Sequence, residues 1–136
     1  MILVDTSPLV AFIDAGQGES HDRSVELYRN IREPLLTTWS CFTEAMYFLY
    51  QRQGWPGQKM LWSFIQREAL FLHASSVTEQ RRLCELMEQY QDVPMDLADA
   101  SLVAAAEILG MRRIFTLDSD FYVYRLHGTE AFEVIR

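Results

Sequence analysis

The sequence begins Met1-Ile-Leu-Val-Asp-Thr-Ser7, in which three apolar residues lead directly into an aspartate. A second, largely apolar run, Ile114-Phe-Thr-Leu, meets Asp118 in the same way near the other end. Short runs of this kind indicate buried strands. In an open α/β sheet, ligands bind just beyond the carboxyl ends of the strands, so we expect Asp5 and Asp118 to face one crevice. Two carboxylates that converge there suggest a bound cation.

Strands and helices alternate along the whole chain. Hydrophobic patterns, capping residues and glycine or proline breaks predict strands at 2–4, 35–37, 70–73, 114–117 and 132–135, and helices at 8–15, 22–32, 40–53, 58–68, 76–90, 97–109 and 121–126. Strands that are separated by helices predict a parallel sheet covered on both faces. We therefore expect an α/β fold, a three-layer α/β/α sandwich around a short central parallel sheet, with residues 1–136 forming one domain.

The size and composition fit such a domain. The chain has 136 residues, of which 49% are hydrophobic, and this is enough for a core without metal or disulfide staples. Cys41 and Cys84 lie in apolar helical patterns, which indicates buried, reduced thiols and a reducing cytosol. No stretch has the pattern of a secretion signal or the ~20 apolar residues that a membrane span needs. We expect a soluble, unprocessed, cytoplasmic protein.

The net charge of −7 argues against general, salt-driven attraction to nucleic acid. It does not exclude a nucleic-acid substrate, because a cation held in an acidic pocket can present positive charge to phosphate. Lys59 is the only lysine, and the other basic residues are arginines, which suit bidentate contacts with phosphate. Candidate phosphate contacts, with solvated surface charge as the alternative role, are Arg23, Arg52, Arg112 and Arg113.

Asp5 and Glu44 each have a functional and a structural interpretation. Asp5 could be a metal ligand or could cap the helix that follows, although Thr6 and Ser7 could provide that cap themselves. Glu44 is the only charged residue within 42–49, in a helix with broad apolar coverage. The structural alternative there is the helix dipole, which favours an acidic residue in the first turn by roughly 0.3–1 kcal/mol. We favour a metal ligand, since an uncompensated carboxylate among apolar groups would tend to neutralise.

Asp96 and Asp99 open an otherwise apolar helix. Asp96 occupies the N-cap position, so capping is its expected role. Asp99 could complement the helix dipole. However, the residues that follow Asp99 are small, which lets the helix lie close against the sheet and holds this carboxylate near the strand ends. We therefore expect Asp99 to have a functional role.

Two further aspartates follow the strand at 114–117. Asp118 lies nearest the strand end and is the expected ligand, with Asp120 as a supporting or alternate ligand. One residue of this segment should also cap the short helix that follows, most naturally Asp120 or Ser119.

Taken as an ordered set, these motifs resemble the PIN-domain family, and most closely the VapC-like ribonuclease toxins of type II toxin–antitoxin systems. The resemblance covers nearly the whole chain and rests on Val4-Asp5-Thr6-Ser7-x-Leu9-Val10, on Glu44 in the helix after the second strand, on Leu97-Ala-Asp99-Ala-x-Leu102-Val-Ala-Ala105 and on Thr116-x-Asp118-x-Asp120-Phe121. Four pieces in order at compatible spacing are fairly specific. The resemblance implies a catalytic, metal-binding quartet of Asp5, Glu44, Asp99 and Asp118, with accessory roles for Asp96, Asp120, Thr6, Ser7 and Thr116.

The same resemblance implies a Mg²⁺-dependent endoribonuclease, with Mn²⁺ as a possible substitute, that hydrolyses RNA phosphodiester bonds. Hard divalent cations prefer oxygen ligands, and crowded carboxylates repel, so without metal at least one should have a raised pKa. Two alternatives remain: a PIN-like nuclease that processes RNA or DNA without being a toxin, and a catalytically silent PIN-like binding module. No zinc-binding spacing, phosphate loop or dinucleotide fingerprint favours another class.

The stretch 39–62 contains all three tryptophans. Helical packing explains most of its aromatic residues, but two helices joined by Gly54-Trp-Pro-Gly57 could present an apolar patch to a partner. The family resemblance implies two partners, a second copy in a homodimer and a VapB-like antitoxin protein that blocks the acidic site.

Overall fold

The computed structural model describes residues 1–136 and has a parallel sheet at its centre. Its strands are β1 (Ile2–Val4), β2 (Leu35–Thr38), β3 (Leu70–His73), β4 (Arg113–Phe115) and β7 (Glu133–Ile135). They lie in the order β3-β2-β1-β4-β7, and every neighbouring pair is parallel. In the register, Leu3 pairs with Leu36 on one side and with Ile114 on the other. The predicted short parallel sheet is confirmed.

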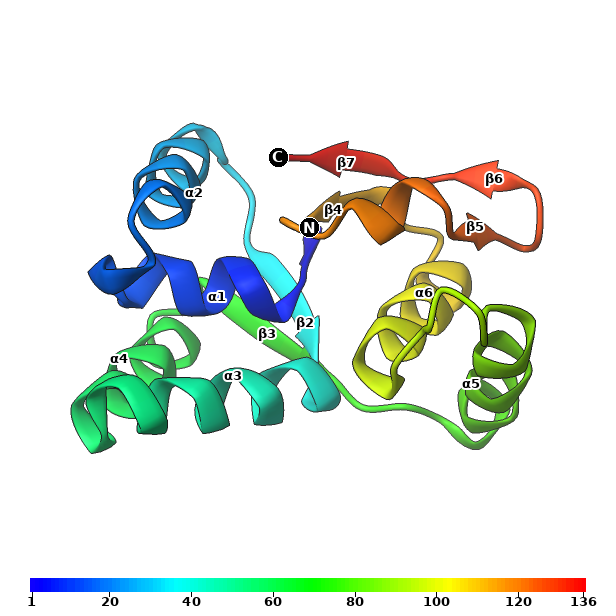
Figure 1. Cartoon of the computed structure of the whole chain (residues 1–136), viewed down its shortest axis with the longest axis horizontal. Coiled ribbons are helices and arrows are strands. Elements are labelled where there is room, and N and C mark those ends of the chain that lie inside the picture. Colours follow the sequence, from blue (N-terminus) through cyan, green and yellow to red (C-terminus); the bar gives the residue numbers. More distant parts are fainter.

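Helices cover both faces of this sheet, which gives the predicted three layers (Figure 1). One side carries α1 (Thr6–Ile13), α2 (Glu19–Asn30), α3 (Trp39–Gln53) and α4 (Trp55–Gln66), and the other carries α5 (Val77–Gln89) and α6 (Leu97–Leu109). Because side chains alternate along a strand, the sheet divides the core into two clusters. Ile2 and Val4 pack with α1, α3 and α4, whereas Leu3 packs with α6.

Helix α6 has the predicted bounds and lies deep in the protein. The side chain of Asp96 caps its first turn, and Gly110 ends it in the left-handed conformation with a φ of 67°. Its residues from Ala98 to Ala106 are all buried, so the helix contacts protein on every side. Small side chains permit this close approach, and the hydroxyls of Ser101 and Thr38 meet at 2.6 Å to tie α6 to the end of β2.

Several predicted helix starts are wrong, and the capping residues explain why. The predicted helix at 8–15 begins at Thr6, because Asp5 caps it, and the helix predicted from Ser40 begins at Trp39, because Thr38 caps it. The helices predicted from residues 22 and 58 begin earlier, at Glu19 and Trp55, directly after glycines. The capping box of Ser76 and Glu79 that starts α5 is confirmed.

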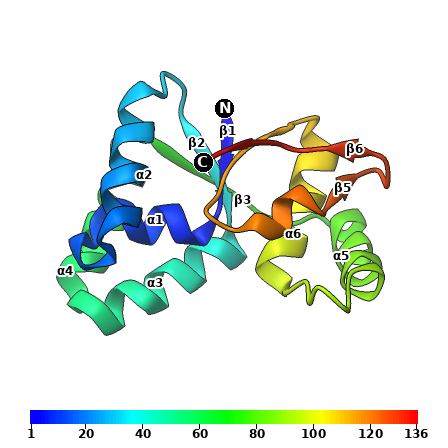
Figure 2. The same cartoon turned by 45° about the horizontal axis from the view of Figure 1, so that its top comes forward.

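The predicted helix at 121–126 is wrong. The chain forms a short 3-10 helix, η2 (Ser119–Tyr122), and then an antiparallel pair, β5 (Arg125–Leu126) and β6 (Glu130–Ala131). Figure 2 shows this pair projecting beyond α6. His127 and Gly128 between the two strands both have a positive φ, a conformation that suits a tight turn and ends a helix.

The two cysteines differ. Cys41 is fully buried, as predicted, and both thiols are free, but Cys84 is exposed, so the prediction of a buried thiol there is wrong. Cys84 lies on α5, whose side chains are largely exposed, and its apolar sequence neighbours did not reveal that orientation. None of the helices combines the length and the apolar character required to cross a bilayer.

Candidate metal centre

The strand order brings the carboxyl ends of β1 and β4 together. From β1 the chain builds the sheet in one direction through β2 and β3, and it then returns to add β4 on the opposite side of β1. Such a reversal of strand order is where α/β proteins bind ligands. Asp5 directly follows β1, and Thr116 and Asp118 follow β4, so all three lie at this position.

Three carboxylates converge at this point. Asp5, Asp99 and Asp118 each offer an oxygen atom, and these three atoms all lie within 4.8 Å of one another. Asp5 is only 5% exposed and Asp99 only 8%. The structure therefore assembles three members of the predicted quartet from β1, α6 and the segment after β4.

Asp5 is both a helix cap and a member of this group. Its Oδ1 accepts a hydrogen bond from the Thr6 backbone N–H at 2.7 Å, which caps α1, and its Oδ2 accepts one from the Thr116 hydroxyl at 2.8 Å. The Thr116 oxygen in turn accepts the backbone N–H of Asp118 at 3.0 Å. The expectation that Thr6 or Ser7 could replace Asp5 as the cap is wrong. Thr116 therefore links the two aspartates through its hydroxyl.

Asp118 is likewise both a helix cap and a member of the group. Its Oδ1 accepts the backbone N–H of Asp120 at 2.9 Å and caps η2, so the prediction that Asp120 or Ser119 forms this cap is wrong. Asp120 is partly exposed and lies outside the group of three. Burial and the charge of Asp118 raise the pKa of Asp120.

Asp99 is held by a residue that the sequence did not indicate as functional. Its Oδ2 accepts a hydrogen bond from the hydroxyl of Tyr124 at 2.9 Å, and Tyr124 is fully buried. A buried tyrosine needs a partner for its hydroxyl, and this was the available signal. The backbone N–H of Asp99 donates to Asp96 at 2.8 Å, which confirms Asp96 as the N-cap, while Asp96 itself is exposed and outside the group of three.

Glu44 lies beside the group without being a member of it. This half-buried side chain comes from α3, and its charge contributes to the raised pKa of Asp5. Burial and the charge of Asp96 raise the pKa of Glu44 itself, and contact with the Thr6 hydroxyl partly offsets this. Ser7 is exposed at the rim of the same region.

The site has an excess of negative charge. Burial raises the pKa of Asp5 to about 6 and that of Asp99 to about 8, hydrogen bonds from Thr116 and Tyr124 oppose these shifts, and neighbouring carboxylates add to them. No arginine, lysine or histidine forms an ion pair with Asp5, Asp99 or Asp118. A bound divalent cation would supply the missing positive charge and displace the proton that Asp99 otherwise keeps.

The donor set fits a hard divalent cation. The group offers oxygen atoms only, which suits Mg²⁺ or Mn²⁺, and it has none of the sulfur or imidazole ligands typical of zinc. Mg²⁺ usually takes one or two carboxylates and keeps several waters. Oxygens within 4.8 Å of one another can contact one such ion directly or through those waters.

The raised pKa values predict how stability depends on pH in the absence of a divalent cation. Between about pH 4, where unfolded aspartates titrate, and about pH 8, the folded state binds more protons than the unfolded chain. The free energy of unfolding therefore falls as the pH rises through this range. In EDTA, we expect a lower melting temperature at about pH 8.5 than at about pH 5.5, and Asp99→Asn should remove most of the decrease. Scanning fluorimetry measures this; equal decreases in both proteins would contradict the assigned proton.

Together, the strand order and the converging carboxylates define an α/β protein with an acidic site of the kind that holds divalent cations. The chain belongs to the PIN domain family, whose model matches residues 2–126. This confirms the resemblance seen in the sequence.

Individual relatives are similar over nearly their whole length. Ribonuclease VapC26 of Mycobacterium tuberculosis is 27% identical over 135 residues, which are 98% of this chain and 99% of that protein. VapC20 of M. tuberculosis, described as a toxin that cleaves the sarcin–ricin loop, superposes with a TM-score of 0.82 at 18% identity, covering 90% of this chain and 94% of the other. VapBC2 of Rickettsia felis, solved with a promoter DNA fragment, gives a TM-score of 0.69 at 16% identity and covers both chains fully.

Proposed function

We propose that the protein is a Mg²⁺-dependent endoribonuclease and the toxin of a toxin–antitoxin pair. The observation that carries this proposal is the convergence of Asp5, Asp99 and Asp118 at the point where the strand order reverses. Membership of the PIN domain family and similarity to a ribonuclease over almost the whole chain support it.

Three of the acidic residues would bind the metal, and neighbouring hydroxyl groups would orient two of them. Asp5, Asp99 and Asp118 would hold the cation, and a bound Mg²⁺ lowers the pKa of a water and stabilises charge on a leaving oxygen. Thr116 and Tyr124 fix the orientations of Asp5 and Asp99 through hydrogen bonds of 2.8 and 2.9 Å. These bonds hold the carboxylates ready before substrate arrives.

Glu44 would act at the edge of the site. It is half-buried, outside the group of three, and its pKa is raised. A carboxyl with a raised pKa accepts a proton more readily than an ordinary glutamate, so we assign Glu44 to orienting the attacking water or moving its proton. Asp96, Asp120 and Ser7 lie at the rim, where they would have accessory roles.

The proposed partners are an antitoxin and a second copy of this chain. The structural neighbours include a toxin–antitoxin complex from Klebsiella pneumoniae, which matches with a TM-score of 0.64 at 17% identity and covers 89% of this chain and 90% of the other. Large apolar side chains are exposed on α3 and α4, where a partner could cover them: Trp39, Tyr47, Phe48, Tyr50, Trp55, Met60 and Trp62. Regulation by such an antitoxin would take place in the cytoplasm, where the RNA substrate is also found.

The decisive experiment is RNA cleavage by the purified protein. We expect it to cut single-stranded RNA with Mg²⁺ or Mn²⁺, to slow by at least about tenfold when EDTA removes the metal, and to recover when metal is restored. Gel analysis of an end-labelled RNA measures the cuts. Cleavage of DNA but not RNA would favour the alternative PIN-like nuclease, and metal binding without any cleavage would favour the silent binding module.

A further inference from the structure

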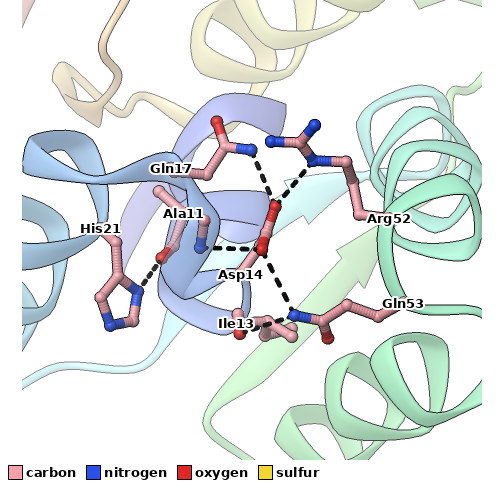
Figure 3. A network of polar contacts seen from close by, with 8 residues as sticks. Ala11, Ile13, Asp14, Gln17, His21, Arg52 and Gln53 are labelled. Carbon is pink, nitrogen blue, oxygen red and sulfur yellow. Dashed lines mark hydrogen bonds and ion pairs between the residues drawn. The ribbon is translucent and has the colours of Figure 1, made fainter.

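A second polar cluster lies about Asp14, at the end of α1, and the proposed chemistry does not use it. The side chain of Asp14 accepts hydrogen bonds from the Gly16 backbone N–H at 3.0 Å, from Gln17 Nε2 at 2.9 Å and from Arg52 Nε at 3.0 Å (Figure 3). Gln53 Nε2 approaches it at 3.4 Å. Asp14 is only 6% exposed, so this cluster is a built feature of the fold.

The cluster fixes the position of Arg52. Hydrogen bonds from Gln17 and Arg52 lower the pKa of Asp14 to about 2, so Asp14 stays ionised and its charge is shared among several donors. Only Nε of Arg52 is engaged; its two terminal nitrogens carry no contact in Figure 3, and the side chain is 53% exposed. A guanidinium held by one edge leaves its other donors oriented for a further acceptor.

One cavity extends from Arg52 to Glu44, beside the acidic site. It has a volume of about 630 Å³, within the range of ligand pockets, and Thr6, Ser7 and Glu44 line it. Arg52, Gln17 and Phe48 line it as well. A ligand in this cavity can therefore contact both Glu44, beside the acidic group, and Arg52.

Two further arginines lie in this direction. A neighbouring cavity is lined by Glu19, Arg23 and Arg136, and it shares Ser20 and Leu117 with the first. Arg23 donates to the backbone oxygen of Arg136 at 2.6 Å. Arg112 and Arg113, by contrast, lie at the amino end of β4, where they pair with Glu130 and Glu33 at 2.8 and 2.6 Å. Those two lie at the opposite edge of the sheet and do not suit contact with a phosphate in the site.

We propose that this cavity binds a nucleotide adjacent to the scissile phosphate of single-stranded RNA, with Arg52 on its phosphate and Phe48 against its base. This rests on the proposed function for the choice of RNA. Phe48 is 44% exposed and lines the same cavity, so its ring is available for stacking. Stacking on aromatic rings combined with cationic contacts to the backbone is how single strands are generally bound.

The test is the affinity of a fluorescein-labelled, random-sequence RNA 12-mer, measured by fluorescence anisotropy in EDTA so that the RNA stays intact. We expect Arg52→Ala to raise Kd about tenfold, which corresponds to roughly 1.4 kcal/mol. It should also lower the slope of log Kd against log salt by about 0.7, the value for one phosphate contact on a single strand. Arg32→Ala is the matched control, because Arg32 is exposed at the other end of the sheet, and it should change neither quantity.

Two further variants test the geometry of the Arg52 guanidinium separately from its charge, and the stacking on Phe48. Arg52→Lys keeps the charge but lacks the planar fork that holds Asp14 by one edge and leaves the other edge for a phosphate, so it should bind RNA about as weakly as Arg52→Ala. Phe48→Leu should weaken binding about tenfold without changing the salt slope, since it removes stacking only. Melting temperatures within a few degrees of the wild type confirm that each variant folds.

The proposal is overturned if folded Arg52→Ala binds like Arg32→Ala, or if Arg52→Lys restores full affinity and slope. These outcomes are distinct from failure of the proposed function. Loss of RNA binding on substitution of Arg52, in a protein that cuts no RNA, would sustain the subsite and reject the nuclease. Normal cleavage together with unaltered binding in both Arg52 variants would sustain the nuclease and reject the subsite.

Discussion

Asp99→Asn is expected to reduce RNA cleavage by at least about 100-fold, since a metal ion contributes several kcal/mol to the stabilisation of a transition state. Asp99 is the most strongly perturbed of the converging carboxyls, with a pKa of about 8. Asparagine has nearly the same shape and keeps an oxygen that can accept the Tyr124 hydroxyl, now at 2.9 Å from Asp99. The charge that would hold the cation is lost, whereas the packing of α6 is retained.

The control for this variant is Asp92→Asn. Asp92 is exposed and lies away from the site, and its substitution removes the same charge. Single-turnover cleavage at saturating Mg²⁺ measures the loss, and calorimetry measures metal affinity. Because burial and, to a lesser extent, repulsion from its neighbours disfavour the ionised form of Asp99, the folded variant should be at least as stable as the wild type above about pH 8. A stable Asp99→Asn protein with undiminished cleavage would rule out the proposed centre.

Phe115→Ala is expected to produce the largest loss of stability, about 3–5 kcal/mol in the free energy of unfolding. Phe115 is fully buried on β4, and its ring meets that of Phe12 edge to face with 5.5 Å between centroids. Removal of the ring leaves a cavity between the sheet and α1, next to Thr116. The loss should therefore also loosen the hydrogen bond that positions Asp5.

Phe71→Ala is the matched comparison. Phe71 lies on the edge strand β3 and is 37% exposed, so the same substitution there should cost less than about 1.5 kcal/mol. Urea unfolding followed by tryptophan fluorescence measures both variants. Equal losses in the two proteins would contradict the placement of Phe115 in the core.

The regular elements were predictable because their signals are local and repeated. β1, β3 and α6 have the predicted bounds, since an apolar strand run, a capping aspartate and a terminal glycine each act within a few residues. The convergence of Asp5 and Asp118 also followed from sequence order combined with the rule for parallel sheets, and that of Asp99 from the small residues that let α6 lie close against the sheet.

Other features depend on contacts that sequence patterns do not contain. The bond from Tyr124 to Asp99 requires the turn after η2, which looked helical, and Asp14 meets Arg52 across 38 positions of the chain. The caps were mistaken for a different reason: neighbouring polar residues such as Asp118 and Asp120 are equally good caps in isolation. Only the tertiary position of the strand end decides between them.

The double engagement of Asp5 has a genetic consequence. One oxygen of Asp5 starts α1 and the other receives Thr116, so a substitution there disturbs both the helix and the site. Asp99 does not cap its own helix, because Asp96 provides that cap. Under the proposed toxin function, overproduction of this protein stops growth. In a selection for surviving cells, full-length suppressor alleles at Asp99 should then accumulate as normal-abundance protein, whereas alleles at Asp5 should show reduced steady-state levels on immunoblots.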